Sequence, residues 1–169
     1  TYEVSTPGHL IYISQNSGWW DKDYIQTANI SFDENEQNVN WDGDDDDGSW
    51  DTEDKKGFSP IGNDATNFTG SYNGQDYTIE NLFIDRSSTN NIGLFGYTNK
   101  DAEISNLELT NIDIDGNMDV GGLAGINYGT INNCTTSGNV NGNNNFTGGL
   151  VGRNSTGTLT NCISNCNVS

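Results

Sequence analysis

The sequence predicts an all-β protein that winds into a parallel β-helix, a solenoid whose successive coils stack on one another. A glycine-bracketed apolar motif occurs three times, with spacings of 29 and 27 residues, at 93–96, 122–125 and 149–152. A recurring asparagine keeps nearly the same period, at Asn81, Asn106, Asn133 and Asn161. Two markers on one period indicate a repeat architecture, in which each unit buries its apolar face against its neighbours.

The strands follow from alternation of apolar and polar residues in segments 104–109 and 112–115. Such alternation directs every second side chain inward, and the inward positions are Leu107, Leu109, Ile112 and Ile114. Pairs such as Asp115-Gly116 accept the backbone angles of corners. No segment shows convincing helical periodicity. A β-propeller blade needs about 40 residues, so the shorter unit favours a β-helix, right-handed by the general crossover preference.

The first 57 residues differ from the rest, because all four tryptophans and the most acidic run lie there. Strand-like pieces at 10–13 and 25–32 are expected to cover the open end of the solenoid, where exposed strand edges would invite pairing with other chains. We therefore divide the chain into a non-repetitive N-terminal capping region, 1–57, and β-helix repeats, 58–169. Most of the tryptophans are expected in the core of the cap, with a sugar-stacking platform as the alternative.

The repeated asparagines and cysteines are predicted to be structural. Stacked asparagine amides can form a hydrogen-bonded ladder along the solenoid axis, and the candidate rungs are Asn106, Asn133 and Asn161. Cys134 and Cys162 occupy equivalent positions on adjacent coils, about 5 Å apart. Parallel ladder side chains do not readily give disulfide torsions, so two stacked thiols are favoured over a bridge. A single histidine makes a zinc site improbable.

The formal charge of −18, from 24 acidic and six basic side chains, argues against nucleic-acid binding. It also disfavours attraction to an anionic membrane surface. No apolar run approaches the roughly 18 residues of a membrane span, so direct membrane insertion is not expected. The remaining interpretations of the acidity are a solvated surface suited to salty surroundings, or a surface that collects divalent cations.

The acidic run between 42 and 54 is the strongest candidate for a specific site. Calcium binds about six to eight oxygens from carboxylate-rich loops, and the candidate ligands are Asp42, Asp44, Asp46, Asp47 and Glu53. Their spacing is similar to an EF-hand loop, but Asp47 stands where that loop requires glycine, and no flanking helices are expected. The sequence therefore predicts a calcium-binding loop of another kind, with a hydrated insertion as the alternative.

Two segments of the chain resemble units of the GLUG-motif repeat family, which read Gly-Gly-Leu-Val-Gly-x-Asn followed by Ile-x-Asn-Cys. The first segment is 121–127 with 131–134, and the second is 148–154 with 159–162. Segment 68–82 also resembles the coil that precedes such repeats. The resemblance covers about residues 58 to 169. It implies a parallel β-helix in a large secreted or surface-anchored protein, often adhesin-like, and it transfers no catalytic residues. Two departures are Ala124, which replaces a larger residue, and Cys166, which stands where the preceding coil has Gly138.

Together these observations predict a non-enzymatic extracellular module, adhesin-like or structural, that presents stacked β-faces and is stiffened by calcium. Expected partners are other surface proteins or glycans, together with self-association along the solenoid axis. The rival class is a polysaccharide-active enzyme or a glycan-binding module on the same scaffold. An enzyme would require outward carboxylates such as Asp113, Asp115 and Asp119 to converge in one cleft. Ice binding is disfavoured, because repeated Thr-x-Thr ladders are absent from the sequence.

Overall fold

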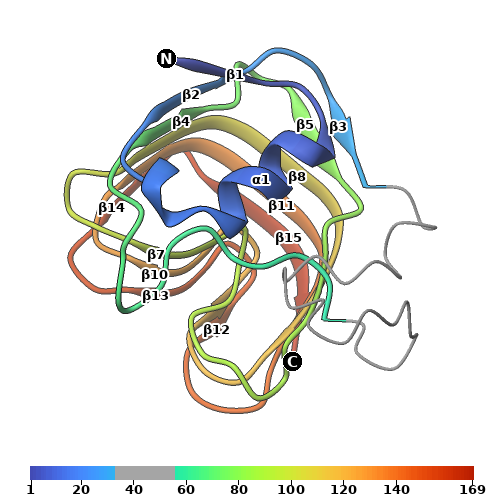
Figure 1. Cartoon of the computed structure of the whole chain (residues 1–169). Coiled ribbons are helices and arrows are strands. Elements are labelled where there is room, and N and C mark those ends of the chain that lie inside the picture. The colour runs from blue at the N-terminus through green and yellow to red at the C-terminus, as the bar shows by residue number, and fades with distance from the viewer. Residues whose placement is uncertain (33–55) are drawn as a thin grey trace, which may run out of the picture.

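Stacked parallel strands dominate the computed structural model of the chain, which describes residues 1–32 and 56–169. The strands form about four turns of a β-solenoid (Figure 1). Every pairing between named strands is parallel, as expected when each coil lies over the corresponding part of the previous one. The all-β, parallel β-helix predicted from the sequence is confirmed.

The largest sheet contains ten strands and forms the longest side of the solenoid. Its main path runs through β1 (Tyr2–Val4), β2 (Asp23–Gln26), β4 (Ser71–Asn73), β8 (Glu103–Gly116), β11 (Thr130–Gly142) and β14 (Thr158–Thr160). Further strands pair alongside that path, namely β3 (Ile30–Ser31), β5 (Thr78–Glu80), β6 (Phe83–Asp85) and β15 (Ile163–Val168). β8 and β11 are the long strands on which the shorter ones stack.

Two smaller sheets close each coil. One contains β7 (Phe95–Thr98), β10 (Ala124–Asn127) and β13 (Val151–Asn154), and the other contains β9 (Val120–Gly121) and β12 (Thr147–Gly148). The glycine-bracketed motif enters the first of these sheets, since Phe95, Ala124 and Val151 lie in register. Its repeat in the sequence therefore marks one position on successive coils.

Asparagines form the corners at which the long strands bend. Asn106, Asn133 and Asn161 share a φ of 53°, in the left-handed region that asparagine tolerates better than most residues. Asn81 belongs to a different corner, because Glu80 pairs with Thr110, which places Asn81 beside Asn111. Grouping Asn81 with the other three was wrong, since its spacing from Asn106 happens to resemble one coil.

Apolar side chains stack in columns inside the solenoid. Ile84, Ile114 and Val140 lie in register and are completely buried. Leu107 pairs with Cys134. Cys162 lies next in the same column, because Thr160 pairs with Asn132 and Ile163 pairs with Thr135. Each coil therefore contributes few apolar residues, but those in the columns lie directly over equivalent residues of the neighbouring coil, which explains how a chain with 31% hydrophobic residues builds a core.

The three cysteines are free thiols, and the Cys134 side chain is fully buried. Burial raises the pKa of the Cys134 thiol to about 12, so its reactive thiolate is scarce at neutral pH. We expect an aromatic disulfide reagent to modify the half-buried Cys162 and Cys166 in the folded protein, and Cys134 only after unfolding. Peptide mapping after brief labelling measures this difference. Rapid labelling of native Cys134 would contradict the buried column.

The N-terminal region contains a helix where the sequence predicted a strand. α1 spans Pro7–Gln15, and a 3-10 turn, η1, spans Ser17–Trp19. The prediction of a strand at 10–13 was wrong, because Thr6 caps the helix through a 3.2 Å bond from the His9 N–H and Pro7 occupies the first turn. Leu10 and Ile13 join the core, and α1 lies across the N-terminal end of the stack (Figure 1).

The segment predicted as a strand at 25–32 overlaps the end of β2 and contains β3, and both strands continue the solenoid. Tyr24 lies in register with Tyr72 of β4, and Ile30 with Ile79 of β5. Trp20 is buried and donates its indole N–H to the Ile13 carbonyl at 2.8 Å, which ties η1 to α1. β2 and β4 pair in one sheet, although they lie on opposite sides of the predicted division after residue 57. The division into two regions stays a prediction.

Candidate functional site

Asparagine amides are hydrogen-bonded from coil to coil at the first corner. Asn133 donates to the Asn106 side-chain oxygen at 3.0 Å, and Asn106 donates to that of Asn73 at 3.0 Å. Asn161 has the same backbone angle, but in the part of the chain that the structure describes its side chain makes no hydrogen bond. The rungs at Asn106 and Asn133 therefore hold neighbouring coils together, which is a structural role.

Further ladders occur that the sequence analysis missed. Asn144 donates to Asn117 at 2.6 Å, and Asn117 donates to Asn90 at 2.8 Å. Asn111 donates to Asn81 at 2.7 Å at the second corner. The spacing of 27 residues between Asn90, Asn117 and Asn144 is the repeat period itself, so a search for every asparagine on that period would have found this ladder.

Asn127 is the most deeply buried rung, with no exposed surface. Its side-chain oxygen accepts from the Thr98 hydroxyl at 2.7 Å and from the Gly129 N–H at 3.1 Å. Its amide nitrogen donates to Asn154 at 2.9 Å and to the Gly129 carbonyl at 3.2 Å. One side chain thus forms hydrogen bonds with polar groups on three successive coils. These bonds matter because a polar group that is buried without a hydrogen-bond partner destabilises the fold.

Asp119 is a buried carboxylate in a turn that the repeat otherwise builds from uncharged residues. It is 1% exposed and has a φ of 57°. The equivalent residues are Asn91 on the previous coil and Phe146 on the next coil, and both also have a left-handed backbone. Arg153 donates to one carboxylate oxygen at 2.9 Å and lies 5.3 Å from the Phe146 ring centre. The other oxygen has no partner within the described residues. Burial raises the Asp119 pKa above 3.8, which the Arg153 charge only partly offsets.

This raised pKa predicts a pH dependence of stability. Folded Asp119 holds its proton to higher pH than unfolded Asp119, so it adds to the free energy of unfolding a contribution that is fully present below the unfolded pKa of 3.8 and is lost as the pH rises through the folded pKa. We expect the Asp119→Asn variant to lack this component, which urea unfolding between pH 4 and 7 would measure. Asp101→Asn, which removes an exposed charge, is the control. Identical pH profiles for the wild type and Asp119→Asn would contradict the assignment.

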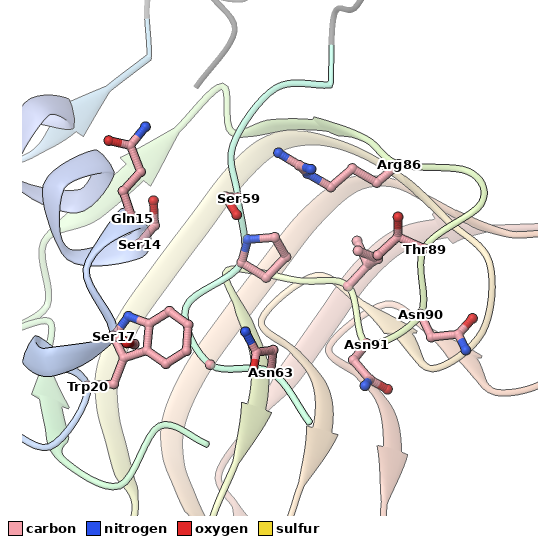
Figure 2. Close-up of a pocket in the computed structure, with 13 residues that line it drawn as sticks. Ser14, Gln15, Ser17, Trp20, Ser59, Asn63, Arg86, Thr89, Asn90 and Asn91 are labelled. Carbon is pink, nitrogen blue, oxygen red and sulfur yellow. The ribbon is translucent and has the colours of Figure 1, made fainter. Parts of the chain in front are cut away.

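A hollow of about 420 Å³ lies between α1, the segment after residue 58 and the turn after β6 (Figure 2). Hydroxyl, amide and ring side chains line it, including Ser17, Trp20, Ser59, Asn63, Thr89 and Asn90. Arg86 extends across it towards Ser59 and donates to the Phe58 carbonyl at 3.2 Å. Its lining holds no carboxylate among the described residues, which is unusual in so acidic a chain.

Residues 116–141 match the family model described as the GLUG motif. This stretch of the chain is a GLUG motif. The resemblance found in the sequence is therefore confirmed by an independent comparison. The GLUG motif contains the Asp119 turn, the buried Asn127 and the Asn133 rung, so its polar residues are those that join one coil to the next.

Two curated relatives are similar to this chain. Halomucin of Haloquadratum walsbyi is 37% identical over 152 residues, which is 89% of this chain and 2% of the relative. A putative Gly-rich membrane protein of Evansella cellulosilytica is 44% identical over 80 residues, which is 46% of this chain and 9% of the relative. The chain therefore spans a small fraction of the relatives it matches. No solved structure matches it.

The carboxylates proposed for an enzyme do not form one group in the described structure. Asp113 and Asp115 lie on β8, outside the GLUG motif, in register with Phe83 and Asp85. Burial, followed by the Asp115 charge, raises the pKa of Asp113. Asp119 is buried against Arg153, and no described hydrogen bond or ion pair connects it to the other two. The described geometry therefore does not place these three carboxylates around a substrate.

The predicted calcium ligands, Asp42, Asp44, Asp46, Asp47 and Glu53, lie outside the described residues. Among residues 1–32 and 56–169, no group of three or more histidine, cysteine or acidic side chains could hold a metal ion. The helices in these ranges are too short and too polar to cross a lipid bilayer.

Proposed function

We propose that the chain is a non-enzymatic module of an extracellular, surface-associated protein, adhesin-like or structural. Its similarity to a halomucin and to a protein named a membrane protein supports surface association. The observation that carries the proposal is the lateral face of the long sheet, where outward residues repeat in register from coil to coil. Examples are the row Glu103, Thr130, Thr158 and the row Ser105, Asn132, Thr160.

Such a face suits contact with an extended partner. Hydroxyl, amide and carboxylate groups recur at the spacing of stacked strands, about 4.8 Å, on a backbone fixed by the sheet and the amide ladders. A repeating polymer can then form many weak contacts whose sum is strong, and neither side loses much conformational freedom. Other surface proteins and glycans are both partners of this kind.

An adhesion assay tests the proposal directly. Beads coated with the chain should adhere to surfaces that carry purified cell-surface polysaccharide or protein, and adhesion should fall at least fivefold when Thr130, Asn132 and Thr135 are changed to alanine on the lateral face. A triple alanine variant at Thr66, Ser88 and Thr156, which are exposed and lie outside the strands of this face, is the control for general loss of hydroxyls. If the chain released sugar from the polysaccharide surface instead, the enzyme class would replace this proposal.

Calcium stabilisation is a separate part of the proposal, supported by the density of carboxylates between residues 42 and 54. A bound cation relieves the repulsion among them, and a ligand that binds only the folded state stabilises it by about 2.7 kcal/mol at a hundredfold excess over Kd. We expect calcium to raise the melting temperature and chelator to lower it. The Asp42→Asn, Asp44→Asn, Asp46→Asn triple variant should lose the response. An unchanged melt of the wild type would remove calcium from the proposal.

The hollow beside α1 favours glycan binding as a second function. Its volume is within the roughly 300 to 1,000 Å³ of ligand pockets, and its hydroxyl and amide side chains can exchange hydrogen bonds with sugar hydroxyls. We expect chemical-shift changes at Trp20 and Asn63 when neutral or uronate-containing oligosaccharides are added. Thr89→Tyr should block them by filling the hollow, whereas Ser88→Tyr, an exposed neighbour outside the lining, should not. Shifts that persist in Thr89→Tyr would exclude the hollow.

A further inference from the structure

Two tyrosines stack against each other across adjacent coils. Tyr97 of β7 lies in register with Ile126 of β10, and Tyr128 follows two residues later, where the alternation of a strand directs it to the same side of the sheet. The ring centres of Tyr97 and Tyr128 are 5.5 Å apart, and the ring planes differ by 15°. Large side chains at such diagonal positions can reach each other. Neither ring belongs to the core, so the pair connects the two coils from outside.

The phenol groups of the two rings also interact. Hydrogen bonding with Tyr128 raises the pKa of Tyr97 to about 12, and hydrogen bonding with Tyr97, followed by Ser155, lowers the pKa of Tyr128. The lowered pKa favours oxidation of Tyr128, because a phenolate loses an electron more readily than a phenol. Since the rings are nearly parallel and their hydroxyls interact, the ring carbons ortho to the two oxygens face each other. Two tyrosyl radicals couple at these carbons.

This pair is accessible from the side of the solenoid. Both rings are half-buried, and with Asn67, Asn99 and Lys100 they line a groove of about 230 Å³. All five residues lie between 67 and 128, so none of them is on the last coil of the chain. A small oxidant can therefore reach the phenol groups.

A second tyrosine pair shows what an unsuitable arrangement looks like. Tyr24 and Tyr72 also lie on adjacent coils, but their ring centres are 6.4 Å apart and the planes differ by 37°. Both are buried, and their hydroxyls donate to the Trp19 carbonyl and to the Gln26 side chain rather than to each other. The molecule thus contains its own comparison for the Tyr97–Tyr128 pair.

We propose that Tyr97 and Tyr128 are a site of oxidative cross-linking, at which a haem peroxidase with hydrogen peroxide, or another one-electron oxidant driven by peroxide, joins the two rings as dityrosine. Each phenol gives up one electron and one proton, and the two radicals form one carbon–carbon bond between their ortho carbons. Each coupled carbon then loses its hydrogen as a proton, while each ring oxygen regains one. The two electrons and two protons released overall reduce one hydrogen peroxide to two waters.

The product connects β7 to β10 by a covalent bond that a reducing agent does not cleave. It joins two coils of one chain, so it fixes their stacking without linking different molecules. The inference does not depend on the proposed function of the module.

Peptide mapping of the folded 169-residue chain after peroxidase treatment tests the cross-link. Trypsin separates the two tyrosines, because it cleaves after Arg86, Lys100 and Arg153. We expect peptides 87–100 and 101–153 to appear as one species, two hydrogens lighter than their sum, in chains that remain monomeric under reducing conditions. Its yield should exceed that of a Tyr24–Tyr72 link at least tenfold, because the reacting carbons are already aligned and accessible.

Phenylalanine variants provide the controls. Tyr97→Phe and Tyr128→Phe should each abolish the linked species, since phenylalanine keeps the ring but forms no phenoxyl radical. Tyr77→Phe removes an exposed tyrosine elsewhere and should leave the yield unchanged. Oxidation in urea should lower the yield at least tenfold, because the alignment depends on the fold. The proposal is overturned if Tyr77 is oxidised while no Tyr97–Tyr128 link forms, if the yield in urea equals that of the folded chain, or if the links join only different chains.

Discussion

Replacing Asn127 with leucine is expected to lower the free energy of unfolding by about 4 kcal/mol. Leucine has the same number and branching of side-chain heavy atoms but no polar atoms, so the buried Thr98 hydroxyl loses its 2.7 Å acceptor and the Gly129 N–H loses its 3.1 Å acceptor. Each buried polar group left unpaired costs about 1–3 kcal/mol. The Asn154 amide and the Gly129 carbonyl lose a donor as well, but Asn154 is exposed and can bond to water.

Asn117→Leu is the matched control for this experiment. Asn117 is also a ladder rung with partners on both neighbouring coils, but its bonds to Asn90 and Asn144 are exposed to solvent. Water can replace these bonds, so the expected loss is about 1 kcal/mol. Urea unfolding of both variants gives the comparison. Equal losses would show that burial does not distinguish the two ladders, and would contradict the central role of Asn127.

Period and alternation were sufficient to predict the coil stacking, because a solenoid repeats the same local choices. Residues one repeat apart in the sequence lie over each other on successive coils. This stacking places Leu107 over Cys134 and Asn106 over Asn133. The same logic failed for Asn81, because the coil before the first regular repeat has different corner spacings. Asn73, which the sequence analysis did not select, bonds to Asn106 instead.

Features that depend on contacts between unlike segments could not be predicted from periodicity. Helix α1 is specified by the cap at Thr6 and by packing onto the end of the core, and a single turn signal carries little weight without that packing. The hollow needs α1, the segment after residue 58 and the turn after β6 together. The Asp119–Arg153 pair joins residues 34 apart on different coils, so neither residue signals the other in the sequence.

Replacing Gly125 with alanine is expected to destabilise the protein by about 3 kcal/mol. A β-carbon at this position would lie 2.7 Å from three backbone atoms of the preceding coil, the carbonyl carbon of Asn91, the oxygen of Gly96 and the nitrogen of Ile92. Backbone atoms in a paired sheet cannot move aside cheaply, and overpacking of this kind costs about 1–3 kcal/mol or more. Gly152 makes the same close approach to Asp119, Val120 and Gly125. The last glycine of the motif therefore sets the distance between coils.

Gly18→Ala provides the control, because no heavy atom lies within 4 Å of the β-carbon it would add. Its effect on unfolding should stay within about 0.5 kcal/mol, as for most exposed substitutions. The two variants differ from the wild type by one methyl group each, so a difference between them measures the space between coils. A Gly125→Ala protein as stable as the wild type would mean that the coils can separate at this corner. The glycine repeat would then need another explanation, such as the conformational freedom of the chain before it folds.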